Sequence, residues 1–438
     1  MTTTPGTSVS ADPVGKASRS VRGKRAAMVL FSYYPSDPRP RRAAEALADA
    51  GMPVDLLCLR EGPQDAKVDR LNGVDIRRVP ISRRRGGILG YLYQYLAFLL
   101  TSSAIVAYRM VSRGRYDLVY VHNMPDFLVL SGLIPKLFGA KVILDLHDPM
   151  PELMQTIFDL PPSAMSVRFM RVVEKWSLGL ADSVITVNRA CAKIFAARSC
   201  PAEKITVVMN SPDETIFSPR DLPSASRSSE RHTNPFVVMY HGSLVERNGL
   251  ALAVDAMSQV RQSIPSAELH VYGSRNAFLE RVMETVKAMG LEQAVHYKGQ
   301  KPLEQIVEAI EVCDVGVIPN QRSIFTELNT PTRIFEYLAL GKPVIAPSAP
   351  GITDYLDGDS LVYFELGSAE DLARRIEYVF HNADEVKEIT RRARQVHLAH
   401  TWQAEKSHLI DVVTGLVSDR FEQVPSTAGA PQRNQQGR

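Results

Sequence analysis

The sequence has few cysteines, and they are not grouped. Cys58, Cys191, Cys200 and Cys313 are the four cysteines of the 438 residues, and no two of them have C-x-x-C spacing. Structural zinc sites and disulfide frameworks need cysteines that are clustered or regularly spaced. We therefore expect reduced thiols, no metal site and a cytoplasmic protein.

Other patterns are missing too. No G-x-G-x-x-G motif follows a predicted strand, which argues against a nucleotide-dependent dehydrogenase. The formal net charge is only +3, and no basic run is interleaved with aromatic residues, so we expect no nucleic-acid partner. Residues 1–24 are rich in Ser, Thr, Gly and Pro and have no apolar signal-peptide core. We expect 1–24 and 423–438 to be disordered tails.

The length and composition indicate two globular domains. A chain of 438 residues exceeds what one hydrophobic core usually organises, and its 45% hydrophobic content is sufficient for two cores. Residues 219–234 are dense in Pro, Ser and charge, where few apolar contacts can cross. We therefore predict an N-terminal domain over 25–218, a linker over 219–234 and a C-terminal domain over 235–400. A last helix over 401–422 has the length to return to the N-terminal domain, but the pattern alone does not decide this.

Short β-branched runs alternate with helical patterns in both halves, which is typical of α/β folds with parallel sheets. The predicted strands of the first half are 26–32, 54–59, 116–122, 141–147, 183–188 and 204–210. Those of the second half are 236–242, 268–274, 295–299, 315–320, 342–347 and 360–364. The sequence therefore predicts two Rossmann-like domains.

One apolar segment competes with an entirely globular interpretation. Residues 88–108 contain no charge and are about as long as a membrane span. Polar residues and four tyrosines in the run, and a following strand of the same sheet, argue against spanning. Five arginines precede it and would attract anionic lipid at about 1 kcal/mol each; they are Arg77, Arg78, Arg83, Arg84 and Arg85. A surface-bound helix, a buried helix and a span remain open, and we favour peripheral membrane contact through 77–108.

Residues 325–347 carry the most informative pattern. Thr330 can cap a helix, Pro331 suits its first position, and Gly341 ends it. The free N–H groups of a helix N-terminus bind anions, and Arg333 in the first turn adds a cation suited to a diphosphate. The segment therefore predicts a phosphate-binding helix start.

Glu336 is the only charged residue in the apolar run 334–340. A buried carboxylate is costly unless it accepts hydrogen bonds, and the hydroxyl groups of a ribose are suitable donors. The alternative is that Glu336 faces solvent or pairs with Lys342.

This segment resembles the donor-binding signature of the retaining GT-B glycosyltransferases of family four, in which a glutamate before a Gly-Lys-Pro turn holds the ribose. Glu336 matches that glutamate. The resemblance continues, in the family's order, through 240–257, 271–274, 297–306 and 313–320. It implies the GT-B architecture, with two parallel sheets facing across a cleft. It further implies transfer of a hexose-type sugar from a nucleotide diphosphate sugar with retention of configuration and without metal or cofactor, as in the bacterial polysaccharide-type subgroup.

The resemblance also assigns donor-binding roles to Gly242 and Gly249 in the glycine loop and to Thr332 beside Arg333. The usual lysine before the second glycine is replaced by Asn248, so we expect Arg247 to contact the diphosphate instead. The alternative is an exposed arginine.

A second departure concerns the family's first glutamate, which stands eight positions before the second. That position is Leu328, and Glu327 precedes it. Either Glu327 substitutes through a shifted loop, or the backbone N–H groups of Asn329 and Thr330 hold the sugar.

In the first half, a buried-type strand leads into His147 and Asp148. Ligands of open α/β sheets bind beyond such strand ends. The pair resembles the family's cleft histidine and acidic residue, which implies contact with the transferred sugar and positioning of the acceptor. The alternative is a structural histidine.

The loop after the first strand lacks the family's glycine pair. Arg39, Arg41 and Arg42 stand there instead, and they either meet anionic groups of the donor or acceptor or form an exposed basic helix start.

The expected acceptor is a glycan or a lipid-linked sugar. Two alternatives remain open: a catalytically silent module that binds a sugar or a partner, which Leu328 and Asn248 make credible, and a GT-B nucleotide-sugar epimerase.

Overall fold

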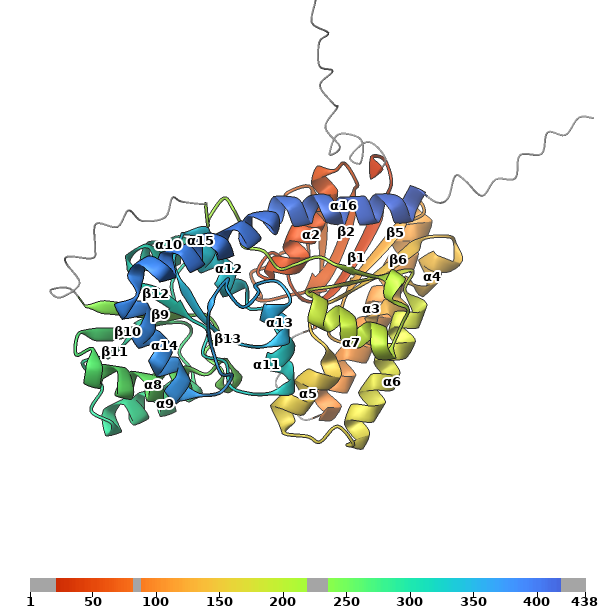
Figure 1. The fold of residues 1–438 in the computed structure, drawn as a ribbon. Coiled ribbons are helices and arrows are strands. Elements are labelled where there is room, and N and C mark those ends of the chain that lie inside the picture. The colour runs from red at the N-terminus through yellow and green to blue at the C-terminus, as the bar shows by residue number, and fades with distance from the viewer. Residues whose placement is uncertain (1–20, 82–87, 219–234, 419–438) are drawn as a thin grey trace, which may run out of the picture.

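The structure, a computed structural model, describes residues 21–81, 88–218 and 235–418. The described chain forms two domains, each a sheet of mainly parallel strands flanked by helices (Figure 1). The predicted α/β fold with two Rossmann-like domains is confirmed. The predicted linker, 219–234, lies outside the described residues.

The N-terminal domain is built on a sheet with the order β3-β4-β2-β1-β5-β6-β7-β8. Its strands are β1 (Ala26–Tyr33), β2 (Val54–Leu59), β3 (Val68–Leu71), β4 (Val74–Val79), β5 (Leu118–His122), β6 (Lys141–Leu146), β7 (Ser183–Thr186) and β8 (Ile205–Val207). Its helices are α2 (Pro38–Asp49), α3 (Ile88–Arg113), η1 (Asp126–Gly132), α4 (Leu133–Leu137), α5 (Met150–Phe158), α6 (Met165–Leu180), α7 (Arg189–Arg198) and η2 (Ala202–Lys204). The hairpin β3–β4 is antiparallel and was absent from the predicted strands.

The C-terminal domain has a six-stranded parallel sheet with the order β11-β10-β9-β12-β13-β14. Its strands are β9 (Phe236–His241), β10 (Ala267–Tyr272), β11 (Val295–Gly299), β12 (Val315–Val317), β13 (Val344–Pro347) and β14 (Val362–Phe364). Its helices are η4 (Glu246–Asn248), α8 (Leu250–Ser263), α9 (Ala277–Ala288), α10 (Leu303–Val312), α11 (Ile324–Leu328), α12 (Thr332–Ala339), α13 (Pro350–Thr353), α14 (Ala369–His381) and α15 (Ala383–Ala399).

The apolar strand runs follow from helices on both faces of each sheet. In β1, Met28 and Leu30 pack in one cluster with α2, whereas Val29 and Phe31 pack on the opposite face against Phe98 of α3. A strand buried on both faces is hydrophobic at every position, and this explains the continuous run.

The last helix, α16 (Trp402–Ser418), crosses back to the N-terminal domain and lies along α2 (Figure 1). Leu409 and Val413 belong to the same apolar cluster as the α2 side chains. Val21 is fully buried in that cluster, and Lys24 Nζ donates to the Val417 carbonyl at 2.9 Å. Residues 21–24 are therefore structured, which corrects the upper bound of the predicted N-terminal tail. Residues 1–20 and 419–438 lie outside the described chain.

The helix α3 is long and apolar enough to cross a membrane, by length and composition, over Gly90–Arg113. One of its faces is part of the domain core, where Phe98 and Val106 are fully buried and Arg109 forms a 2.5 Å ion pair with Asp55 of β2. This packing contradicts the spanning alternative.

The structure also removes one arginine from the basic cluster that was predicted to contact a membrane before α3. Arg78 is buried and paired with Asp69 at 3.1 Å, so it does not face a membrane. Arg83, Arg84 and Arg85 lie outside the described residues.

Candidate active site

The carboxyl ends of the central strands of both sheets meet at the domain boundary. In the C-terminal sheet the strand order reverses between β9 and β12, and in the N-terminal sheet it reverses between β1 and β5. Ligands of open α/β sheets bind at such reversal points. His241 ends β9, Asn320 follows β12, and His122 ends β5. The topology thus places these side chains at the two binding positions.

Neighbouring groups approach the backbone of the glycine loop so closely that little room is left for a Cβ atom at Gly242 and Gly249. Gly242 has φ 122°, and a Cβ there would meet the Arg333 side chain at 3.1 Å. Gly249 has φ 74°, precedes α8, and a Cβ there would overlap the Pro319 carbonyl oxygen. Only glycine fits both conformations.

Arg333 joins the helix α12 to this loop. Its Nη1 donates to the His241 carbonyl at 2.5 Å, and its guanidinium lies over the Tyr240 ring at 4.9 Å. The helix begins at Thr332 with Pro331 as N-cap residue, so the expected cap by Thr330 is wrong. The Thr330 hydroxyl instead bonds the Gly351 carbonyl.

Glu336 lies next to Arg333, and its side chain is 15% exposed. Its Oε2 is 3.4 Å from His241 Nε2. Burial raises the pKa of Glu336 to about 7, against the opposing charges of Arg333 and Arg42. Burial and Arg333 lower the pKa of His241 to about 3, so the imidazole is neutral and does not neutralise the carboxylate.

Lys342, the alternative partner expected for Glu336, does not pair with it. Lys342 Nζ instead donates a hydrogen bond to the Cys313 carbonyl at 2.7 Å. Within the described ranges, the Glu336 carboxylate has only the 3.4 Å contact with His241 Nε2, which is not a hydrogen bond, and the buried side-chain amide of Asn320 has no hydrogen-bond partner. Buried polar atoms without partners are rare in native proteins, and water or a ligand at this position would satisfy them.

Leu328, which stands where the family has its first glutamate, lies in a segment that contacts the N-terminal domain. Leu328 packs against an apolar cluster of the N-terminal domain, and Asn188 Nδ2 donates to the Leu328 carbonyl at 2.8 Å and to Thr330 Oγ1 at 3.0 Å. The Asn329 N–H donates to the Phe325 carbonyl at 3.1 Å, so it is not free to hold a sugar. Glu327 lies half-buried on α11, and both Glu327 and the Thr330 N–H remain candidates for the contact with the sugar.

Arg247 faces the N-terminal domain. Its guanidinium lies over the Phe325 ring at 5.6 Å and lowers the pKa of Asp148 across the boundary, whereas burial raises that pKa above its ordinary value. Asn248, at the position of the usual lysine, donates to the Ser243 carbonyl at 2.9 Å and so shapes the loop.

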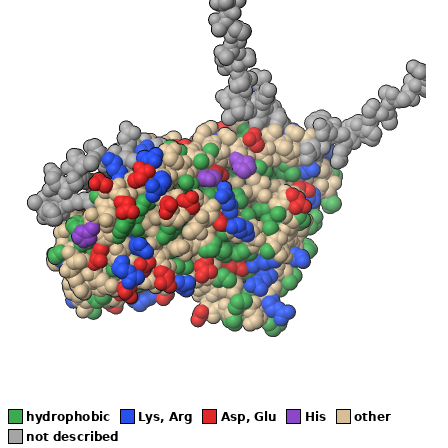
Figure 2. All heavy atoms as spheres, viewed as in Figure 1, with side chains coloured by type: hydrophobic (Ala, Val, Ile, Leu, Met, Phe, Trp, Pro, Cys, Tyr) green, Lys and Arg blue, Asp and Glu red, His purple; other side chains and the backbone are tan. Residues whose placement is uncertain are grey.

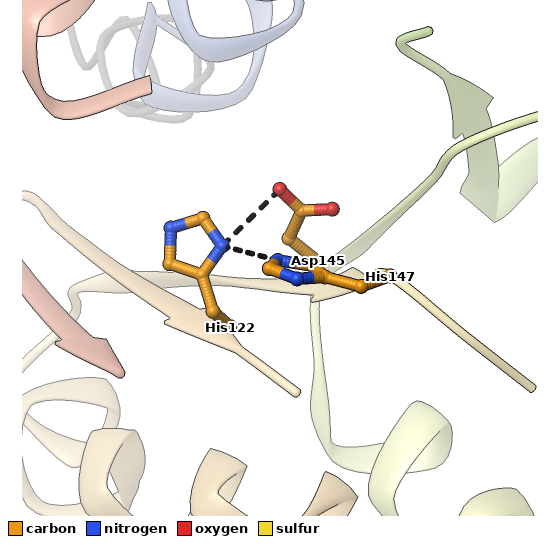
Figure 3. A group of neighbouring side chains, drawn as sticks. All are labelled: His122, Asp145 and His147. Atoms are coloured by element: carbon orange, nitrogen blue, oxygen red, sulfur yellow. Dashed lines mark hydrogen bonds and ion pairs between the residues drawn. The ribbon is translucent and has the colours of Figure 1, made fainter. Parts of the chain in front are cut away.

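On the N-terminal side, His147 belongs to a cluster with His122 and Asp145 (Figure 3). His122 Nδ1 lies 2.9 Å from His147 Nε2 and 3.4 Å from Asp145 Oδ2. Arg39 Nη2 forms an ion pair with Asp145 Oδ1 at 2.7 Å, and the Tyr120 hydroxyl donates a hydrogen bond to Asp145 Oδ2 at 2.9 Å. Arg39 is therefore buried in an ion pair, which contradicts its expected contact with a substrate anion.

Arg41 and Arg42 differ from Arg39. Arg41 contacts Glu45 at 3.6 Å and Asp213 at 3.8 Å on the surface. Arg42 bonds the Ser211 carbonyl, and burial lowers its pKa to about 10. It lies near enough to Glu336 to influence the pKa of that residue, so Arg42 is the member of the three that reaches the donor side.

The charges fix the hydrogen positions in the histidine cluster. Burial raises the pKa of Asp145, but Arg39 and His122 together hold it below its usual range, so the carboxylate accepts hydrogen bonds only. His122 Nδ1 therefore carries hydrogen, and His147 Nε2 accepts. Burial lowers the pKa of His147 to about 3, so the ring is neutral and its hydrogen is on Nδ1. His147 Nδ1–H is then a donor suited to a sugar oxygen.

Comparison with known proteins identifies the two halves. The model of the family described as "Glycosyl transferase 4-like domain" matches residues 37–211, and that of "Glycosyl transferases group 1" matches residues 223–396. The chain belongs to the GT-B glycosyltransferases of family four.

Relatives of this glycosyltransferase are distant. The Escherichia coli protein "Putative colanic acid biosynthesis glycosyltransferase WcaL" is 24% identical over 217 residues, which are 49% of this chain and only 52% of the relative. The Bacillus subtilis "Putative glycosyltransferase EpsD" is 22% identical over 69% of this chain and 78% of its own length. The Streptomyces fradiae 2-deoxystreptamine N-acetyl-D-glucosaminyltransferase is 27% identical over 72% of this chain and 74% of its own length.

Solved GT-B structures share the fold. Sucrose-phosphate synthase from Thermosynechococcus elongatus has a TM-score of 0.72 at 18% identity, covering 90% of this chain and 100% of that one. Anabaena HepE in complex with UDP-glucose has a TM-score of 0.60 at 17% identity, covering 91% of this chain and 99% of that one.

His122, Asp145 and His241 line the candidate site of this glycosyltransferase but were not predicted from the sequence. A signal was present, since His122 and His241 each end a strand and Asp145 interrupts an apolar one. Polar residues at the carboxyl ends of parallel strands indicate a ligand-binding edge.

Replacing His147 by alanine should lower turnover roughly ten- to a hundredfold while changing nucleotide affinity less than threefold, because the ring lies on the acceptor side and offers one hydrogen bond. Steady-state turnover and calorimetric nucleotide binding would be measured together, with the exposed His381→Ala as matched control. Equal loss of both quantities would make His147 structural, and unchanged turnover would end its functional assignment.

Proposed function

We propose that this glycosyltransferase transfers a hexose-type sugar from a nucleotide diphosphate sugar to a glycan or lipid-linked acceptor, with retention of anomeric configuration. The observation that carries the proposal is the shielded Glu336 carboxylate at the strand-order reversal, adjacent to Arg333 and held within the described residues only by a 3.4 Å contact with His241 Nε2. The name of WcaL, a putative colanic acid biosynthesis glycosyltransferase, supports surface polysaccharide or glycoconjugate synthesis as its setting, on the cytoplasmic side of the membrane.

In this proposal Glu336 accepts hydrogen bonds from two ribose hydroxyls. Arg333, Arg247 and the N–H groups at the starts of α8 and α12 hold the diphosphate; Thr332 opens α12. As the bond between the anomeric carbon and the diphosphate oxygen breaks, these donors stabilise the leaving negative charge, and no metal is needed for it.

The sugar then lies between the glycine loop and His147. His147 Nδ1–H orients a sugar oxygen, and Glu327 is the candidate second carboxylate for its hydroxyls. The acceptor hydroxyl arrives on the face from which the diphosphate leaves, and its proton passes to a diphosphate oxygen. Asp148, opposite Arg247, helps to position the acceptor.

The test of transfer is release of free nucleoside diphosphate. The protein would be incubated with UDP-, GDP-, ADP- and dTDP-sugars, with and without a membrane extract. We expect release from one donor, increased by the extract. Nucleotide binding without release under both conditions would favour the silent binding module, and interconversion of the donor sugar would favour the epimerase.

An exposed apolar surface supports a lipid-linked acceptor. On α6, four large apolar side chains are at least half exposed at helical spacing, and α5 adds two more; the set is Ile157, Phe158, Met165, Phe169, Val172 and Trp176. We call this set the α5–α6 surface. The basic residues Arg168, Arg171 and Lys175 flank it on α6. Over this part of the N-terminal domain, Figure 2 shows hydrophobic and basic side chains interleaved.

Helices with an apolar stripe bordered by cations bind anionic membrane surfaces. The surface is also close to the chemistry, because α5 begins at Met150, directly after the His147–Pro149 segment of the site. A lipid-anchored acceptor held at the α5–α6 surface would therefore have a short path to His147. The peripheral contact predicted through residues 77–108 stays a prediction beside this surface, because α3 also exposes Tyr93, Leu100 and Val111.

Reversing the charges of Arg168, Arg171 and Lys175 should weaken binding to anionic vesicles more than a hundredfold, since each cation contributes about 1 kcal/mol near such a surface. Co-sedimentation with phosphatidylglycerol vesicles would measure this, and high salt should release the wild type. Phe169→Ser with Trp176→Ser should also weaken pelleting, whereas the matched control Leu398→Ser on α15 should not. Undiminished pelleting of both variants would contradict this surface.

A further inference from the structure

A second cluster of metal-type ligands lies away from the proposed active site, on the edge of the C-terminal sheet. Glu268 and His270 are on β10, and His296 is on β11, the edge strand. In the parallel register His270 is directly opposite His296, and Glu268 is two residues earlier on the same face. Because side chains alternate along a strand, the intervening Leu269 points to the opposite face and into the core.

The ligand atoms of these three side chains converge. Glu268 Oε2 lies 2.9 Å from His270 Nε2 and 3.4 Å from His296 Nε2. All three ligand atoms are within 4.8 Å of one another. Two ligands that coordinate one tetrahedral zinc ion at usual bond lengths are about 3.3 Å apart, so small adjustments would seat an ion between them.

The chemistry of the cluster also suits a transition metal. Two imidazole nitrogens and one carboxylate oxygen form a three-ligand zinc set that leaves one position for water. The side chains are 16%, 27% and 30% exposed for His270, Glu268 and His296, so an ion from solvent can reach them.

We propose that Glu268, His270 and His296 form a zinc-type divalent metal site that links the edge strand β11 to β10. On binding, the ion replaces the hydrogen that His270 Nε2 shares with the Glu268 carboxylate, and the ring hydrogen resides on Nδ1. The ion then cross-links two neighbouring strands of the donor domain. Lys298 is the cation that opposes it, because it stands two residues after His296 on β11 and therefore on the same face of the strand.

Untagged protein would be equilibrated with ZnCl2, and bound zinc measured by elemental analysis, with CoCl2 absorption as a second probe of four-coordination. We expect one ion per chain. His270→Gln and His296→Gln should each weaken binding at least tenfold, since glutamine can hydrogen-bond Glu268 but is a poor zinc ligand. Lys298→Gln should tighten binding. His381→Ala is the matched control on an exposed histidine and should bind zinc as the wild type does.

The variants His122→Gln and His147→Gln separate this site from the His122–Asp145–His147 cluster, whose carboxylate is occupied by Arg39. The proposal would be overturned if the His122 and His147 variants lost zinc binding while the His270 and His296 variants kept it. Absence of bound zinc in the wild type would overturn it as well. Circular dichroism of each variant would establish that the fold is intact.

Discussion

Replacing Glu336 by glutamine is expected to weaken binding of the nucleotide donor roughly 30- to 1000-fold. A hydrogen bond to a charged group contributes about 1.5–3 kcal/mol, so removing the charge that serves two ribose hydroxyls should cost about 2–4 kcal/mol of binding free energy. The melting temperature of the free protein should not fall, because within the described residues this carboxylate has only the long 3.4 Å contact with His241 Nε2, whose imidazole is neutral. Calorimetric titration and thermal melting measure the two quantities.

The pH dependence of binding provides a second readout. The pKa of Glu336 is raised to about 7 in the ligand-free protein, so the group is mostly neutral below that pH and loses its ability to accept two ribose hydrogen bonds. Nucleotide affinity should therefore rise about tenfold from pH 6 to pH 8. Glu336→Gln should lose this rise and retain only the part that comes from the nucleotide's own titration.

Arg333→Ala is the companion variant. It should strongly weaken binding of the nucleoside diphosphate and hardly change binding of the bare nucleoside, because the Arg333 guanidinium contacts the diphosphate in the proposed complex. If Glu336→Gln bound the donor normally and melted far lower, the residue would be a structural element of the core and the donor site would be misplaced.

Arg39→Met is expected to lower the free energy of unfolding of the N-terminal domain by about 3–5 kcal/mol. The substitution leaves the Asp145 carboxylate buried without its cation, and an uncompensated buried charge has this cost. Urea unfolding followed by tryptophan fluorescence would measure it. Arg41→Met is the matched control, because its ion pairs are long and exposed and contribute at most about 1 kcal/mol.

The free energy of unfolding that Arg39→Met loses should decrease as the pH falls. The pKa of Asp145 is held below its usual range in the folded protein, so the pair stabilises above pH ~4, the ordinary range of the group, and the stabilisation declines as acid protonates it. The wild type and Arg39→Met should therefore converge at low pH. The double variant Arg39→Met with Asp145→Leu should recover much of the stability. Equal stability of Arg39→Met and the wild type at neutral pH would contradict the assigned pair.

The fold could be predicted because parallel strands covered on both faces are continuous apolar runs, such as β1 and β9. The hairpin β3–β4 was missed because its short strands are polar, and β3 is exposed. Asn72 and Gly73 join the two strands with φ 50° and 79°, and Asn-Gly is the usual sequence of such turns. This signal was in the sequence and would have predicted the hairpin.

The donor half of the site could be predicted in part, because Arg333, Glu336 and the glycine loop lie at helix starts and strand ends that the local sequence marks. The N-terminal half could not. Arg39 and Asp145 are 106 residues apart, and only the tertiary fold shows that their charges meet. Leu328 likewise replaces an expected carboxylate, and its packing against the other domain explains why an apolar residue is stable there.

The most direct test of the central claim is a crystal structure of the protein with the nucleoside diphosphate of its donor. We expect ribose hydroxyls at hydrogen-bond distance, about 2.7–3.2 Å, from the Glu336 carboxylate, with the diphosphate against Arg333 and the start of α8. A nucleotide bound elsewhere, or one whose ribose does not contact Glu336, would contradict it.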